Sequence, residues 1–195
     1  PSNFRSQETI DHFMKEENII GLAGVDTRQL TRLLRQKGIM NGMITCEDPQ
    51  PRMKAILAQL KAYQIGDGPG QVSSQTCHEY LPEGKTSAEE CQCRVVVYDF
   101  GLKTSQIKSF LLRDCHLTVV PYQTPVEEVI AKAPDGIFLS DGPGDPNANQ
   151  ELLDNIEKLC KSGIPILGIG LGHQLMAKAN GAQTWKLKHG HRGVN

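Results

Sequence analysis

The second half of the chain alternates apolar runs with amphipathic segments, and this alternation constrains the fold more than any other feature of the sequence. The apolar runs predict strands at residues 94–98, 117–120, 136–139 and 164–169. Stretches with helical periodicity predict helices at residues 103–113, 125–132, 149–161 and 172–179. Strands that alternate with helices form a parallel sheet covered on both faces, and ligands bind at the carboxyl ends of its strands. We therefore expect an α/β fold with its site at that edge.

The first half of the chain follows a different pattern, without regular alternation. Amphipathic helices are predicted at residues 6–17, 27–37 and 51–62, and a strand at residues 41–46. Ser6 and Asp26 are expected to cap the first two helices, and Gly38 to end the second. Arg28, Arg32 and Arg35 fall away from the leucine face of that second helix, which fits either a solvated face or a docking face for a partner or a phosphate.

Periodicity disappears between residues 66 and 90. Gly66-Asp67-Gly68-Pro69-Gly70 is followed there by Ser, Thr, Pro and Glu residues, a composition typical of linkers. The sequence therefore predicts part of one domain at residues 1–65, a linker at residues 66–92, and a second domain at residues 93–195.

Charge and hydropathy argue against two classes of partner. The 195 residues carry 21 Lys and Arg against 22 Asp and Glu, a formal charge of -1, which gives no basic footprint for nucleic acid or an anionic membrane. No apolar run approaches the ~20 residues of a membrane span, and the first residues lack a signal-peptide pattern. We expect a cytoplasmic protein that binds neither nucleic acid nor membrane.

The six cysteines predict neither disulfides nor a structural metal site. Only Cys91 and Cys93 lie close together in the sequence, and their spacing is not the C-x-x-C of zinc and thioredoxin-like sites. We therefore expect free thiols and no metal.

Two glycine-rich loops follow predicted strands at the expected site edge. The first, Ser140-Asp141-Gly142-Pro143-Gly144-Asp145-Pro146, can point backbone amides at an anion. The second, Gly168-Ile169-Gly170-Leu171-Gly172-His173-Gln174, turns a strand sharply into a helix. Small residues two before and two after the turning residue are typical of a nucleophile elbow.

The second loop also has a simpler interpretation, as a phosphate-binding turn at a helix N-terminus. It lacks the G-x-G-x-x-G spacing of dinucleotide sites, because His173 stands three residues after Gly170, and no Gly-Lys-Ser/Thr follows. For His173 alone, a structural role is a commoner explanation than a catalytic one.

Together these motifs resemble those of the small, glutamine-hydrolysing subunit of carbamoyl-phosphate synthase, over essentially the whole sequence. Ser2-Asn3-Phe4-Arg5 and Asp26-Thr27-Arg28-Gln29-Leu30-Thr31-Arg32 look like that subunit's own N-terminal domain. Tyr98-Asp99-Phe100-Gly101, the two glycine-rich loops and Gly190-His191-Arg192-Gly193-Val194-Asn195 are similar to the triad-type class I amidotransferase domain. The resemblance implies an N-terminal α/β domain followed by part of a parallel-sheet, flavodoxin-like domain.

The resemblance also implies an activity, which is hydrolysis of glutamine to glutamate and ammonia. In this family the ammonia passes through a channel to a large synthetase subunit, the partner in a heterodimer that makes carbamoyl phosphate for pyrimidine and arginine biosynthesis. ATP and magnesium are expected on the large subunit, and no cofactor is expected in this chain. Carried over by position, the nucleophilic cysteine falls on Gly170 and the oxyanion donors fall on the backbone amides of Gly142 and Leu171. A side chain that contacts glutamine falls on Gln174, and Gly144 is a further oxyanion- or glutamine-binding position.

Two residues depart from the family's pattern. Gly170 supplies no thiolate, and Asp141 stands where the family usually has asparagine. The family's catalytic His and Glu are expected beyond Asn195, and a further N-terminal portion before Pro1. The sequence therefore predicts a glutaminase subunit that is inactive as written. A non-hydrolysing pseudo-amidotransferase with a structural or regulatory role is the alternative, and a flavodoxin-like module that binds a phosphate is a third interpretation.

Overall fold

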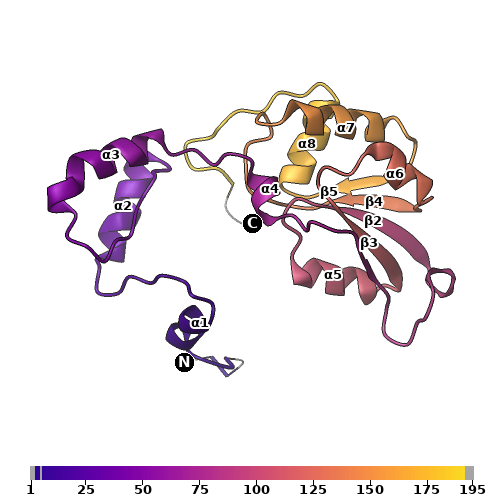
Figure 1. Ribbon diagram of the computed structural model, residues 1–195, viewed down its shortest axis with the longest axis horizontal. Coiled ribbons are helices and arrows are strands. Elements are labelled where there is room, and N and C mark those ends of the chain that lie inside the picture. The colour runs from indigo at the N-terminus through magenta and orange to yellow at the C-terminus, as the bar shows by residue number, and fades with distance from the viewer. Residues whose placement is uncertain (1–2, 5, 192–195) are drawn as a thin grey trace. The chain divides into compact units, whose positions relative to one another are not determined.

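The structure is a computed structural model of the chain in which residues 3, 4 and 6–191 are described (Figure 1). Ser2 and Arg5 of the opening motif, and residues 192–195 of the closing motif, lie outside the described residues. The chain divides into two compact units, one of Pro1–Tyr63 with Lys186–Asn195 and the other of Gln64–Trp185. Within the described residues, no helix has the length and apolar character needed to cross a membrane.

The second unit is built on a five-stranded sheet with the order β1-β3-β2-β4-β5. Its strands are β1 (His78–Tyr80), β2 (Cys93–Asp99), β3 (Cys115–Pro121), β4 (Gly136–Leu139) and β5 (Ile166–Gly168). β2, β3, β4 and β5 run parallel, and β1 joins β3 in the antiparallel direction. The parallel strands follow the order of a flavodoxin-like sheet, in which the strand order reverses between β2 and β4. The expected α/β fold is confirmed.

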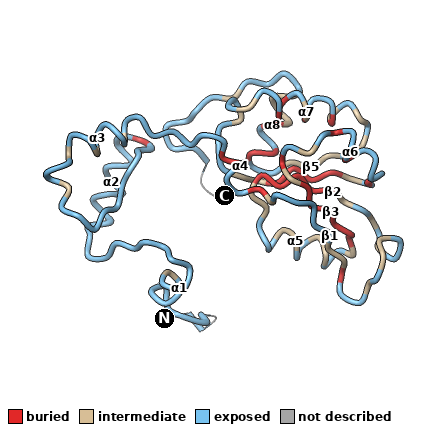
Figure 2. Tube along the Cα trace, in the orientation of Figure 1, coloured by how far each residue is buried: buried red, intermediate tan, exposed pale blue. Residues whose placement is uncertain are grey.

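Helices cover both faces of this sheet (Figure 1). They are α5 (Thr104–Leu111), α6 (Val126–Ala131), α7 (Gln150–Cys160) and α8 (Leu171–Ala179). Residues of β4 are buried on both faces of the sheet. Ile137 and Leu139 pack in one core with α6, α7 and α8, whereas Phe138 packs in a second core with α5. Figure 2 shows the resulting burial along the central strands.

The segment at residues 66–92 differs from the free linker that its composition predicts. α4 (Gly68–Val72) starts after the N-cap Asp67, β1 pairs with β3, and a short 3-10 helix η2 (Ala88–Glu90) leads into β2. The N–H of Tyr122 donates to the Ser73 hydroxyl at 3.1 Å, and Ser73 is buried. The turn-forming residues therefore serve close packing on the sheet, and the segment belongs to the second unit.

The first unit contains α1 (Ile10–Glu16), α2 (Thr27–Lys37), the 3-10 helix η1 (Gln50–Arg52) and α3 (Met53–Ala62). The predicted bounds of α2 are confirmed, with Asp26 accepting the N–H of Gln29 at 2.8 Å and Gly38 ending the helix at φ +89°. The cap predicted for α1 is wrong, because Thr9, not Ser6, accepts the N–H of His12.

The predicted strand at residues 41–46 is also absent from the described structure, which pairs this stretch with no other strand. Alternation alone cannot form a strand, because the backbone groups need a neighbouring strand. Of the described residues of this unit only Gly38 is buried, so its apolar side chains are exposed or at most half-buried (Figure 2).

Candidate functional site

Three strand ends meet where the strand order of the sheet reverses. The N–H of Phe100, after β2, donates to the Ser140 hydroxyl at 2.9 Å, and that hydroxyl donates to the Asp141 carbonyl at 3.0 Å. From the first turn of α8, which follows β5, the N–H of Gly172 donates to the Ser140 carbonyl at 3.2 Å. The completely buried Ser140 therefore connects the loops after β2 and β4 with the start of α8.

The turn from β5 into α8 has the geometry of a nucleophile elbow. Gly170 is the N-cap of α8, with φ +55° and ψ −115°, a conformation that L side chains adopt only under strain. Two residues before it, a Cβ on Gly168 would lie 2.7 Å from the Met176 sulfur, and two residues after it, a Cβ on Gly172 would overlap the Leu139 carbonyl. Glycines at both flanking positions are therefore required by packing, as an elbow demands.

The Asp141 carboxylate lies directly at this elbow. Its Oδ1 accepts the N–H of Gly142 at 2.8 Å and the N–H of Leu171 at 3.0 Å. Both amides are those to which the family resemblance assigns oxyanion donation, and the structure brings them to one oxygen atom. Asp141 is partly buried, and its contact with both amides was not predicted from the sequence.

The other residues singled out from the sequence lie around this centre. Gly144 is exposed, at φ +115°, in the loop after β4. Gln174 and His173 are exposed on the first turn of α8, and the N–H of Gln174 donates to the Gly170 carbonyl at 3.0 Å. The structure therefore places Gly142, Gly170 and Leu171 around one carboxylate and leaves the Gln174 side chain facing solvent.

Sequence reasoning missed the role of Asp99 in supporting the site. Its Oδ1 accepts the N–H groups of Gly101 and Leu102 at 2.9 Å and 2.8 Å, and its Oδ2 accepts the N–H of Ser74 at 2.9 Å. This carboxylate, 8% exposed, fixes the turn after β2 and attaches the α4 segment to it. The signal was an aspartate directly at a strand end, where its side chain can accept amides of the following turn.

Three cysteines of the second unit lie away from the elbow and cannot supply a nucleophile there. Cys93 and Cys115 pair at the amino ends of β2 and β3, the opposite edge from the site, and burial raises the pKa of Cys115 to about 12. Cys77 precedes β1, which is four strand spacings, or ~19 Å, from β5. These three cysteines cannot take the place of a side chain at position 170.

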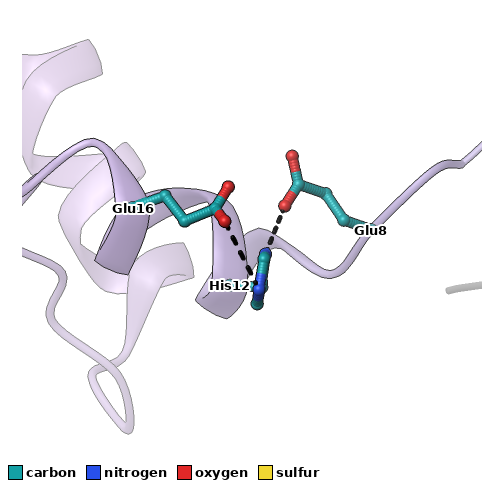
Figure 3. A group of neighbouring side chains, drawn as sticks. All are labelled: Glu8, His12 and Glu16. Carbon is teal, nitrogen blue, oxygen red and sulfur yellow. Dashed lines mark hydrogen bonds and ion pairs between the residues drawn. The ribbon is translucent and has the colours of Figure 1, made fainter.

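The first unit carries a separate cluster of titratable side chains, shown in Figure 3. His12 Nδ1 lies 2.6 Å from a Glu8 oxygen and its Nε2 lies 3.6 Å from a Glu16 oxygen. The three residues are four apart in sequence and exposed, with ligand atoms within 4.8 Å of one another. Spacing of this kind is that of ordinary ion pairs on a helix surface, which accounts for the arrangement without a ligand.

Comparisons with known proteins agree with the geometry of the second unit. The family model described as glutamine amidotransferase class-I matches residues 96–195, and the model of the carbamoyl-phosphate synthase small chain, CPSase domain, matches residues 1–44. The carbamoyl phosphate synthase small chain of Listeria monocytogenes serotype 4b (strain F2365) is 43% identical over 196 residues, covering 100% of this chain and 51% of the relative. That of Salmonella typhimurium (strain LT2) is 44% identical over 207 residues, covering 100% and 54%.

The chain thus spans about half the length of the curated relatives it matches. A solved structure from Thermoplasma acidophilum, assigned as part of a GMP synthase, is 24% identical with a TM-score of 0.45, over 60% of this chain and 53% of that one. The family model covers more than half of the residues, including the end of β2, all of β4, the elbow and the Asp141 loop. The chain belongs to the class-I glutamine amidotransferase family and is similar throughout to carbamoyl phosphate synthase small chains.

Proposed function

We propose that this chain is the corresponding part of a glutamine-hydrolysing carbamoyl phosphate synthase small subunit, and that it does not hydrolyse glutamine as it stands. The proposed lack of hydrolysis rests on Gly170, which occupies the elbow at φ +55° without a side chain. Attack on a carboxamide requires a nucleophile, and a backbone without a thiolate has none to offer. The convergence of the amides of Gly142 and Leu171 on one oxygen atom supports the assignment to this family, because acyl-transfer enzymes hold an oxyanion with two such donors.

The proposal includes the partners of that subunit. Ammonia would be delivered through a channel to a large synthetase subunit in a cytoplasmic heterodimer that serves pyrimidine and arginine biosynthesis. ATP and magnesium would bind the large subunit, with no cofactor in this chain. A subunit that lacks its own nucleophile would leave its partner dependent on free ammonia. Such a subunit would be a pseudo-amidotransferase with a structural or regulatory role. Gly170 and Asp141 favour this second candidate over an active subunit.

The test supplies nitrogen to the complex in two forms. The chain is combined with the large chain of a carbamoyl phosphate synthase, and carbamoyl phosphate formation is measured with glutamine and with ammonium. We expect formation with ammonium only, and glutamate release no faster than in a protein-free control. Glutamate release well above that control would contradict the proposed lack of hydrolysis, and failure of the two chains to associate would contradict the proposed partner.

A further inference from the structure

Two amides from different strand-end loops converge on one oxygen atom of Asp141. The N–H of Gly142 belongs to the loop after β4 and donates at 2.8 Å, whereas the N–H of Leu171 begins α8 and donates at 3.0 Å. In acyl-transfer enzymes an oxyanion is held by one amide after the nucleophile and another from a neighbouring loop. The Asp141 carboxylate therefore stands where the negative oxygen of a reacting substrate would stand.

The glycine at position 170 is what leaves room for this carboxylate. A Cβ built on Gly170 would overlap three atoms of Asp141, namely Oδ1, Cγ and Oδ2. A side chain at position 170 and the Asp141 carboxylate in its present place would therefore compete for the same space. The two departures from the family's pattern are thus one structural arrangement, in which the absence of a side chain at one position permits a charged side chain from the other.

We propose that Asp141 is an autoinhibitory residue whose carboxylate occupies the oxyanion niche formed by the amides of Gly142 and Leu171. This inference rests on the proposed function only for the identification of the two amides as oxyanion donors. A hydrogen bond to an ionised acceptor is shorter and stronger than one between neutral groups, so a substrate carbonyl, neutral in its ground state, competes poorly for the same amides. A nucleophile restored at position 170 must therefore compete with the Asp141 carboxylate, unless that carboxylate is also removed.

The first part of the test follows the two amide protons by NMR in the 15N-labelled chain. Loss of the carboxylate in Asp141→Ala is expected to move both amide protons upfield. Asp145→Ala is the matched control, because it removes an exposed aspartate from the same loop and leaves both resonances in place. Asp141→Asn keeps an oxygen acceptor of similar size without the charge and is expected to give an intermediate position for both resonances.

The second part asks whether an external carboxylate replaces the deleted one. Formate is added to Asp141→Ala, with chloride at equal ionic strength as control, and is expected to return both amide protons toward their original positions. The unsubstituted chain is expected to show no response, because its own carboxylate fills the niche. Resonances that do not differ between the unsubstituted chain and Asp141→Ala would overturn the proposal, as would resonances that move but do not return with formate.

A measurement on the unsubstituted chain keeps the proposal testable if Asp141→Ala fails to fold. The amide of Gly142 is expected to exchange with deuterium more slowly than the amide of exposed Gly144 in the same loop. Exchange at Gly142 as fast as at Gly144 would overturn the proposal. The inference is tested by the chemical shifts and exchange rates of these amides, whereas the proposed function is tested by glutamate release. A failure of one can therefore be distinguished from a failure of the other.

Discussion

The N–H of Leu171 donates a 3.0 Å hydrogen bond to Oδ1 of Asp141, thirty residues earlier in the chain. This bond links the loop after β4 to the first turn of α8, and it does so at the elbow where Gly170 lacks a side chain. A negative charge at a helix N-terminus is favoured by the helix dipole, so the contact stabilises the fold while it occupies the site. Stability and closure of the niche therefore have the same cause.

The core beneath α7 provides a test of the fold of the second unit. Ile156 is 0% exposed and packs against the sheet with Leu152 and Leu159. Ile156→Ala is expected to lower the free energy of unfolding by about 2–5 kcal/mol, because it removes buried methylene groups and leaves a cavity. Leu112→Ala, at a position 87% exposed, is the control and is expected to change it by less than about 0.5 kcal/mol. Urea unfolding followed by circular dichroism measures both, and equal effects would contradict the assigned core.

A second prediction concerns the pH dependence of stability through Asp135. Its carboxylate accepts the backbone N–H of Arg94 at 2.7 Å, and this hydrogen bond, with a smaller contribution from the Arg94 side chain, lowers the pKa of Asp135 below its ordinary value. A pKa depressed by folding stabilises the protein above the unfolded pKa of ~3.9, and the contribution is lost as pH falls through the folded value.

Asp135→Asn is therefore expected to unfold at a lower temperature than the unsubstituted chain at pH 7, with a difference that shrinks below about pH 4. Thermal unfolding across pH 2.5–7 is the measurement, with Glu83→Gln, at an exposed position, as the control. A difference that is the same at every pH would show that the charge of Asp135 has no part in the effect.

Much of the second unit was predictable because local pattern and tertiary structure agree there. The strand predicted at residues 136–139 has these bounds in β4, since its apolar residues face cores on both sides of the sheet. Residues 66–92 were not predictable as packed structure, because glycine and proline occur both in linkers and where segments pack closely. The predicted N-cap of α1 was Ser6 and the observed one is Thr9, because both side chains can accept a backbone N–H and the sequence alone does not distinguish them.

The candidate site was also predictable from the sequence only in part. The sequence predicts that the loops carrying Gly142 and Leu171 share one edge, because the carboxyl ends of parallel strands lie together. It does not predict that the Asp141 carboxylate accepts hydrogen bonds from both amides. That arrangement depends on a contact between residues thirty apart in the sequence. The link between Asp141 and Gly170 is steric and appears only when both are placed in space.

A third prediction concerns the arginines of α2. Arg28, Arg32 and Arg35 line one hollow with Thr27 and Thr31, so all three share a side of the helix. If this side docks on the proposed large subunit, Arg28→Ala with Arg32→Ala weakens association at least tenfold, or about 1.4 kcal/mol, because arginine pairs with carboxylates in interfaces.

The control for this prediction removes two cations elsewhere in the same unit, by Arg52→Ala with Lys54→Ala. Titration against the large chain at two salt concentrations measures both double variants. A solvated basic face predicts a change below ~0.5 kcal/mol for each double variant. Unchanged affinity and unchanged salt dependence for Arg28→Ala with Arg32→Ala would remove α2 from the interface.

Closure of the elbow by Asp141 is measured most directly by the alkylation rate of a thiol introduced by Gly170→Cys, with and without Asp141→Ala. Iodoacetamide labelling and peptide mass mapping follow this rate. A thiol at a helix N-terminus has a lowered pKa, whereas a neighbouring carboxylate raises it and here fills the same space. The exposed Cys46 and Cys77 serve as internal references. We predict that the introduced thiol reacts faster than both references in the double variant and much more slowly in Gly170→Cys alone. Equal rates in the two variants would contradict the claim that Asp141 closes an otherwise complete elbow.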